Sequence, residues 1–387
     1  MGSILEDVYY YDAPPTKLVI GYGTVAKVAE EIRELSISRP LIVTDRGVRD
    51  AGIVDKLLGV LSPLELAYFM FDEVEPNPRV STAERGAAIY RKDGCDGLIS
   101  IGGGSPMDTA KAIGVLVTHP GSLFDYEGLE KVKFPIPPHI AIPTTYGTAS
   151  ELSFGAMITD PKRNFKASIG SRLLFPEVAI IDPELALHLP HRIAASTGMD
   201  SLTHGIETYV SRKAQPITEA ISLHAVRLVS ENLRKAVAGD REGTFNAMLA
   251  STMTGFCALH TRTGAVHSMA HTLGGHFDIP HGIANAILLP HVMEFNLEAC
   301  PEKYREVSKA MGEEVGRLSP KEAARKSVEA VRRLMRDLDL PTRLREVGCD
   351  RKKFPQLVED SLKSANMPQN PRAVTPDDIF QLFVKAY

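Results

Sequence analysis

The sequence contains no tryptophan and only four cysteines, none of them in a CxxC pair. Cysteines scattered in this way are typical of reduced, packed thiols in a cytoplasm rather than of a disulfide framework. No run of about 18 apolar residues occurs, which excludes a membrane-spanning helix. The first residues, MGSILEDVYYYD, are acidic and aromatic, so we expect no secretory signal.

Neither sign of charge is in large excess, since the formal net charge is −4 and no basic block is present. Nucleic acid is therefore not an expected partner. The hydrophobic fraction of 44% is ordinary for a globular protein, and 387 residues are enough for two domains with separate cores. The composition predicts a soluble protein of the cytoplasm that does not bind membranes.

The first half of the chain alternates short apolar runs with helical patterns. Strands are predicted for residues 17–23, 40–45, 66–72, 97–104, 139–147 and 178–182. Helical patterns cover residues 27–35 and 82–94. Because continuously apolar strands that alternate with helices are typical of parallel sheets, we expect a mostly parallel sheet covered on both faces. Ligands bind such sheets at the carboxyl ends of the strands.

The strand signals stop after residues 183–190, and the remaining sequence predicts one helix after another. Two helix starts are explicit, because Ser319 and Thr375 each precede a proline and have an acidic residue three positions on. The predicted architecture is an α/β domain over residues 1–185 and an all-α domain over residues 186–387. A ligand shared by the two domains would lie in the cleft between them.

An apolar strand runs into three glycines at residues 102–104, followed by Ser105 as the expected N-cap and Pro106 as the first helical residue. Three glycines let the backbone approach a ligand closely, and a helix N-terminus attracts phosphate. A tight turn would also use glycine, but three glycines before a capped helix favour phosphate binding. The motif is not GxGxxG, because Met107 stands at the third glycine position.

Two further features follow predicted strands. Asp45 ends the strand over residues 40–45, where a carboxylate can accept hydrogen bonds from an adenosine ribose and would repel a 2′-phosphate. This position favours NAD over NADP, although an aspartate is also an ordinary turn residue there. The hydroxyl-rich segment over residues 142–151 suits pyrophosphate and ribose contacts or, equally, a turn.

The helical half contains a cluster of metal-binding residue types. Asp200 and His204 are one helical turn apart, and His267 and His271 repeat this spacing on a second helix. His281 follows after a short loop. A carboxylate and several imidazoles without sulfur predict a divalent transition-metal site, although the spacing does not decide which histidine is the spare one. A purely structural metal site is the alternative.

Together these segments resemble the iron-containing (group III) alcohol dehydrogenases, and within them the lactaldehyde reductase (1,2-propanediol oxidoreductase) branch. The resemblance covers essentially the whole chain. It rests on PNP (76–78), GGGSPMDTAKAIG (102–114), PTTYGTASE (143–151), GMDSLTHGIETY (198–209), HSMAHTLGGHFDIPHGIANAILLPH (267–291) and NPR (370–372). It implies an N-terminal dinucleotide-binding α/β domain and a C-terminal helical metal-binding domain, with iron in the cleft.

The resemblance also implies residue roles. The implied metal ligands are Asp200, His204, His267 and His281. The expected cofactor contacts are Asp45, Asn77, Gly102, Gly103, Gly104, Ser105, Asp108, Thr144, Thr145, Thr148 and Lys166. His271 is implied to lie near the nicotinamide rather than on the metal. We expect it to be catalytic, as the proton route between alkoxide and solvent, with support of the metal site as the alternative.

The implied activity is hydride transfer between NAD(H) and a short-chain alcohol or aldehyde, with diols and lactaldehyde-like compounds among the candidates. Fe(II) is the implied metal, although the ligands also suit Zn, Ni, Co or Mn, and a homodimer or higher homo-oligomer is expected. Alternatives are a metal- and NAD-dependent non-redox enzyme of the dehydroquinate synthase type and, within redox chemistry, a glycerol dehydrogenase.

Three positions depart from the family pattern. Tyr146 replaces a small residue beside the cofactor loop, where the family usually has PTTAGTGSE or PTTAGTAAE. His260 and Arg262 stand where the family commonly has small and apolar residues in a GLG-like turn near the substrate end. One hypothesis is that Arg262 binds an anionic group of the substrate, such as that of an anionic aldehyde. An ion pair at the surface or between the domains is the alternative.

Overall fold

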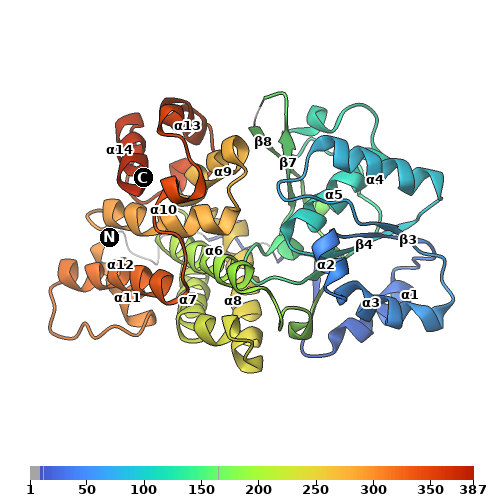
Figure 1. Cartoon of the computed structure of the whole chain (residues 1–387), viewed down its shortest axis with the longest axis horizontal. Helices are drawn as coiled ribbons and strands as arrows, with labels where there is room; N and C mark the ends of the chain where they lie inside the picture. The colour runs from blue at the N-terminus through green and yellow to red at the C-terminus, as the bar shows by residue number, and fades with distance from the viewer. Residues whose placement is uncertain (1–8, 12, 164) are drawn as a thin grey trace.

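The computed structural model describes the chain except for residues 1–8, 12 and 164. Most of the segment used to argue against a secretory signal therefore lies outside the described residues. Figure 1 shows two halves side by side, one built on β-sheets and one built of helices. Among the described helices, none is both long and apolar enough to cross a membrane.

The six predicted strands are all present and form one sheet. They are β1 (Lys17–Ile20), β2 (Pro40–Val43), β3 (Phe69–Phe71), β4 (Gly97–Gly102), β6 (His139–Pro143) and β9 (Val178–Ile181). Their order is β1-β9-β6-β4-β2-β3, and every pair is parallel. The prediction of a parallel sheet is therefore confirmed.

Helices cover both faces of this sheet, which explains its continuously apolar strands. On one face, α4 (Val80–Lys92) and α5 (Gly104–Thr118) share a core cluster with Leu41 and Leu98. On the other face, α1 (Val28–Glu34) and α3 (Ile53–Leu61) share a second cluster with alternate strand residues such as Ile42. The helix α2 (Arg46–Asp50) follows β2 directly.

A second, smaller sheet was missed by the sequence prediction. It contains β5 (Gly128–Leu129), β7 (Gly155–Asp160) and β8 (Phe165–Gly170) in the order β5-β8-β7. The strands β7 and β8 are antiparallel and alternate between buried and less buried residues, so they lack a continuous apolar run. The strand β8 contacts α9 of the helical half, and the second sheet thus links the two halves.

The helical half begins after β9, as predicted. Its helices are α6 (His191–Val210), α7 (Pro216–Val237), α8 (Arg241–Thr261), α9 (Ala265–Phe277), α10 (His281–Asn296), α11 (Pro301–Ala310), α12 (Pro320–Asp337), α13 (Phe354–Leu362) and α14 (Pro376–Ala386). Ser319 and Thr375 are the N-caps of α12 and α14, each with both capping-box hydrogen bonds. The described part of the chain therefore confirms both predicted helix starts. The domain boundary near residue 185 falls between β9 and α6 and stays a prediction.

Short 3-10 helices complete the described elements. They are Thr24–Lys27, Ser62–Leu64, Leu123–Tyr126, Ser150–Leu152, Arg172–Leu174, Pro183–Leu185, Leu344–Val347, Arg351–Lys353 and Met367–Gln369. Two of these turns, Thr24–Lys27 and Pro183–Leu185, connect a strand to the helix that follows, and two, Ser150–Leu152 and Pro183–Leu185, contact α8.

The predicted start of α5 was wrong by two residues. Gly103 is the N-cap and Gly104 the first helical residue, so Ser105 and Pro106 lie inside the first turn. The chain can turn this early because Gly102 has a φ of 150°, which side-chain-bearing residues rarely adopt. Gly103 has no side chain to cap the helix, and the first-turn amides therefore have no side-chain cap.

Gly198 sets the distance between α6 and α7. A Cβ placed there would lie 2.0 Å from Cδ1 of Leu233, far inside van der Waals contact. We expect Gly198→Ala to lower the free energy of unfolding by about 1–3 kcal/mol through overpacking, as measured by urea denaturation. The matched control is Gly316→Ala, where no atom lies within 4 Å of the added carbon. Equal effects of the two substitutions would contradict this packing argument.

Candidate active site

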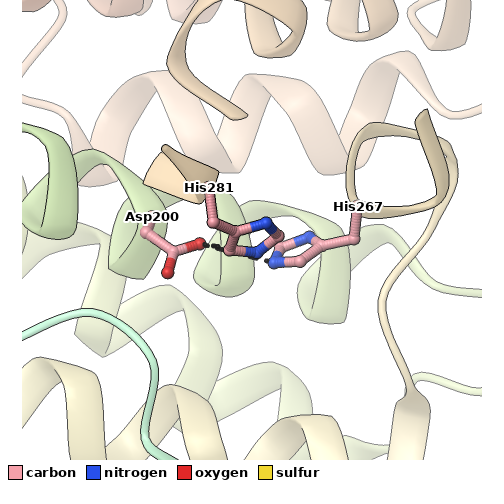
Figure 2. Close-up of side chains that lie close together, drawn as sticks. All are labelled: Asp200, His267 and His281. Atoms are coloured by element: carbon pink, nitrogen blue, oxygen red, sulfur yellow. Dashed lines mark ion pairs between the residues drawn. The ribbon is translucent and has the colours of Figure 1, made fainter. Parts of the chain in front are cut away.

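Three histidine ring nitrogens converge on one carboxylate oxygen. The Nε2 atoms of His204, His267 and His281 lie 3.8, 3.5 and 3.6 Å from Oδ1 of Asp200. Figure 2 shows Asp200 with two of these rings. The ligand atoms of Asp200, His267 and His281 all lie within 4.8 Å of one another, and Nε2 of His204 is 3.1 Å from Nε2 of His267. The structure thus brings all four predicted metal ligands together.

Three helices meet to build this cluster. Asp200 and His204 lie one turn apart on α6, as their spacing predicts. His267 lies in the first turn of α9, and His281 is the first residue of α10, directly after Pro280. The sequence prediction placed these side chains on two helical segments, whereas the structure uses three.

Asp200 and His267 are buried, His204 and His281 are partly exposed, and the four groups interact electrostatically. Burial alone would raise the pKa of Asp200, but the surrounding imidazoles, His281 first, outweigh burial and hold the pKa well below its usual value. Burial lowers the pKa of His204 to about 4 and that of His281 to about 3. Both rings are therefore neutral at physiological pH. Neutral imidazoles beside an ionised carboxylate are the protonation states that bind a metal.

Glu207 orients His267 and was not identified from the sequence. Its carboxylate accepts hydrogen bonds from Nδ1 of His267 at 2.6 Å and from the backbone N–H of Val266 at 2.7 Å. Because Nδ1 donates its proton to Glu207, Nε2 is left to face the cluster, as in many metal sites. Burial would lower the pKa of His267, but Asp200 and Glu207 outweigh burial and raise the pKa to about 9. The pocket thus favours a positive charge at Nε2, which a bound cation would also supply.

The side-chain amide of Asn285 provides a test of whether a cation fits. Its Nδ2 lies 2.6 Å from Oδ1 of Asp200, 3.1 Å from Nε2 of His281 and 3.4 Å from Nε2 of His267. With the ring of His267 in its neutral form, two amide hydrogens cannot satisfy three acceptors, and within the described residues Oδ1 of Asn285 has no partner. Lone pairs therefore converge on a point that a divalent cation fits better than a side-chain amide.

His271 lies beside this cluster. Its ring stacks on His281 with centroids 5.1 Å apart and an interplanar angle of 17°. Burial, followed by His281 and Lys166, lowers the pKa of His271 well below its usual value, so the ring is neutral. His271 also lines a cavity of about 250 Å³ together with Lys166 and Arg262.

The predicted cofactor residues of the first half meet at the carboxyl edge of the large sheet, because β6, β4 and β2 are neighbours. A Cβ added at Gly102 would lie 3.4 Å from Oδ2 of Asp45. One at Gly103 would lie 3.6 Å from the Thr145 side chain, and one at Gly104 would lie 3.1 Å from that of Thr148. Among the described residues, Oγ1 of Thr145 is buried without a partner. The glycine turn lets the backbone approach a ligand closely, its first-turn amides have no side-chain cap, and the hydroxyl of Thr145 has no partner. These three features suit the binding of a pyrophosphate.

Comparison with known proteins identifies the family to which the chain belongs. Residues 15–183 match the model of the iron-containing alcohol dehydrogenases, and residues 194–387 match the C-terminal model of the Fe-containing alcohol dehydrogenase family. The chain belongs to the iron-containing alcohol dehydrogenase family. Its lactaldehyde reductase relative from Escherichia coli strain K12 is 38% identical over 369 residues, which cover 95% of this chain and 97% of the relative.

Solved structures share the whole fold. A 1,3-propanediol oxidoreductase is 39% identical with a TM-score of 0.95, covering 98% of this chain and 100% of that chain. A sulfoacetaldehyde reductase from Bifidobacterium kashiwanohense, solved in complex with NAD+, is 29% identical with a TM-score of 0.86, covering 98% and 99%. The predicted fold class and the predicted alcohol/aldehyde oxidoreductase activity are confirmed. The match favours this activity over the dehydroquinate synthase type.

Two acidic residues among the predicted cofactor contacts of this alcohol dehydrogenase also have partners within the protein. Oδ1 of Asp45 caps α2 by accepting from the N–H of Val48 at 2.9 Å, which leaves Oδ2 toward Gly102. The carboxylate of Asp108 accepts from Oγ of Ser150 at 2.6 Å and from the N–H of Met157 at 3.0 Å. Asp108 therefore holds the loop after β6, and its cofactor role stays a prediction.

The remaining predicted contacts lie on the loop after β6 and on the second sheet. Thr144 donates its backbone N–H to the carbonyl of Gly102 at 2.9 Å, which fixes this loop against the glycine turn. Lys166 on β8 donates to Oδ1 of Asn77 at 3.2 Å. A Cβ at Gly274 of α9 would lie 3.6 Å from that oxygen, so Asn77 reaches the helical half. Asn77 and Lys166 thus lie at the junction of the two halves.

The departures from the family pattern occupy different surroundings. Tyr146 is fully buried in the core cluster shared mainly by the helical half, and among described residues its hydroxyl has no hydrogen-bond partner. Nδ1 of His260 lies 2.9 Å from the carbonyl oxygen of Phe256. His276, which also lines the cavity, lies 2.9 Å from Oδ2 of Asp360. Of the three residues that differ from the family pattern, only Arg262 lines the cavity beside His271.

We expect Glu207→Gln to weaken divalent-metal binding by about 10- to 100-fold, because an amide no longer fixes Nδ1 of His267 as the donor. Dissociation constants for Fe(II), measured anaerobically, test this expectation. The control is Glu294→Gln, which removes an exposed ion pair with Arg332. If Glu207→Gln binds metal like the control, the orienting role of Glu207 is wrong.

Proposed function

We propose that this alcohol dehydrogenase transfers a hydride between NAD(H) and a short-chain alcohol or aldehyde, with Fe(II) held by Asp200, His204, His267 and His281. The observation that carries the proposal is the convergence of three Nε2 atoms on Oδ1 of Asp200 at 3.5 to 3.8 Å. Two of these rings are neutral, and Glu207 holds the third with Nε2 facing inward.

A metal ion bound here would act as a Lewis acid on the substrate oxygen. Imidazole and carboxylate ligands without sulfur also suit Zn, Ni, Co and Mn, and affinity alone does not select iron. Iron is favoured by the family to which the chain belongs.

NAD(H) is supported by the residues at the carboxyl edge of the large sheet. The uncapped turn at residues 102–104 and the hydroxyl of Thr145 suit the pyrophosphate. The half-buried carboxylate of Asp45 would repel the 2′-phosphate of NADP. We assign cofactor binding mainly to residues 1–185 and metal binding to residues 186–387, so that the nicotinamide meets the metal between them.

His271 is our candidate for moving the proton. Its neutral ring stacks on His281 and lines the cavity, and these two contacts support a proton route that starts beside the proposed metal site. A neutral imidazole can accept the proton of an alcohol or return it to an alkoxide. Support of the His281 ring is the alternative role.

The substrate is proposed to be small. The cavity measures about 250 Å³, and relatives are named for lactaldehyde and 1,3-propanediol. Short diols and hydroxyaldehydes are therefore the first compounds to test. We further propose a cytoplasmic homodimer or higher homo-oligomer.

The proposal predicts NADH-linked reduction of short aldehydes that depends on a divalent metal. Under anaerobic conditions, chelation is expected to abolish NADH consumption and added Fe(II) to restore it, with NADH preferred over NADPH. His267→Ala is expected to lose both bound metal and turnover, whereas His224→Ala, at an exposed position on α7, keeps both. Turnover that persists in metal-free protein, or no NADH consumption with any metal and aldehyde, would contradict the proposal.

A further inference from the structure

Arg262 has an unusual backbone for its residue type. It follows the last residue of α8 and has φ 54° and ψ 179°. This combination lies at the border of a region that is essentially restricted to glycine. A residue with a side chain is held there only when its surroundings over-determine the conformation, and such positions are concentrated at functional sites.

Arg262 lines the cavity of about 250 Å³, and its side chain has no acidic partner among the residues that the structure describes. Two carboxylates border the same cavity, but Glu127 pairs with Arg163 at 2.7 Å and Asp360 pairs with His276 and Lys363, each at 2.9 Å. No ion pair of Arg262 occurs within the part of the chain that the structure describes. Among these residues, the alternative of an ion pair at the surface or between the domains is therefore not observed.

The cavity adjoins the metal cluster, because His271 forms part of its wall and stacks on His281. Its other wall groups include three serine hydroxyls, those of Ser168, Ser268 and Ser364. The side chains of two lysines, Lys166 and Lys363, also border the cavity. A guanidinium without an acidic partner, in a small polar cavity beside the proposed reaction centre, is suited to bidentate binding of an anionic group.

We propose that Arg262 binds the anionic end of the substrate, so that the preferred substrates are short aldehydes carrying a carboxylate, sulfonate or phosphonate group and the corresponding alcohols. This assignment rests on the proposed hydride-transfer function and narrows its substrate class. The distal anion lies at Arg262, while the carbonyl end points toward the cluster that includes His281. Reduction adds a hydride from NADH to the carbonyl carbon and a proton to the carbonyl oxygen, and it yields the hydroxy acid and NAD+.

A cofactor phosphate is the other source of a suitable anion. The residues that line the cavity include Lys166, an expected cofactor contact, but none of the glycine turn at residues 102–104, beside which the pyrophosphate is expected. The anion at Arg262 is therefore assigned to the substrate. A change in the KM for NADH on removal of the guanidinium would instead indicate a cofactor contact.

The test uses matched aldehydes with and without a carboxylate, such as 4-oxobutanoate and butanal, on the metal-loaded enzyme. Arg262→Gly removes the guanidinium and suits the backbone conformation, so the fold is retained. The wild type is expected to favour the charged aldehyde in kcat/KM, and Arg262→Gly is expected to lower the charged-to-neutral ratio by about 10- to 100-fold. The matched control is Lys363→Ala, since Lys363 borders the same cavity but pairs with Glu359 and Asp360. It should leave the ratio unchanged.

Calorimetric binding of butanoate, an unreactive carboxylate, gives a readout that does not require turnover. Binding is expected in the wild type and in Lys363→Ala and is expected to be lost in Arg262→Gly. Equal losses for charged and neutral aldehydes, or unchanged butanoate binding in Arg262→Gly, would overturn the anion assignment and leave the redox function intact. No NADH consumption with either aldehyde would instead refute the redox function on which the assignment rests.

Discussion

The helical half depends on one constraint, which is that a carboxylate oxygen and three histidine ring nitrogens must be held close together. Three ring nitrogens lie 3.5 to 3.8 Å from Oδ1 of Asp200, and two of them, on His204 and His267, are 3.1 Å apart. Such groups repel one another unless positive charge lies between them. The arrangement also requires α10 to start almost in contact with α6, and Gly282 permits this because a Cβ there would lie 2.2 Å from the carbonyl oxygen of Ser196.

The parts of the fold and of the site that depend on local periodicity could be predicted from the sequence. Continuously apolar runs identified the six strands of the large sheet, since burial on both faces leaves no room for alternation. The spacing of Asp200 and His204 placed both on one face of α6. The residues after β2, β4 and β6 met at one edge of the sheet because parallel neighbours end on the same side.

The parts that depend on tertiary contacts could not be predicted. Glu207 lies on α6 two turns after Asp200, but its role is set by the N-terminus of α9, which is distant in sequence. Asn285 lies one turn after His281, and no periodicity distinguishes it from a core amide. The strands β7 and β8 lack the continuous apolar run by which the strands of the large sheet were recognised, although β8 carries Lys166, which lines the cavity. The early start of α5 followed from the backbone conformation of Gly102.

The coordination of the metal is the most direct test of this account. X-ray absorption at the iron edge, on protein loaded anaerobically with Fe(II), reports the number and type of ligand atoms. Three imidazoles and at least one oxygen, without sulfur, are expected at the iron, and the oxygen ligand of Asp200 is expected to be lost in Asp200→Ala. A sulfur ligand, or a spectrum with fewer than three imidazoles, would contradict this expectation.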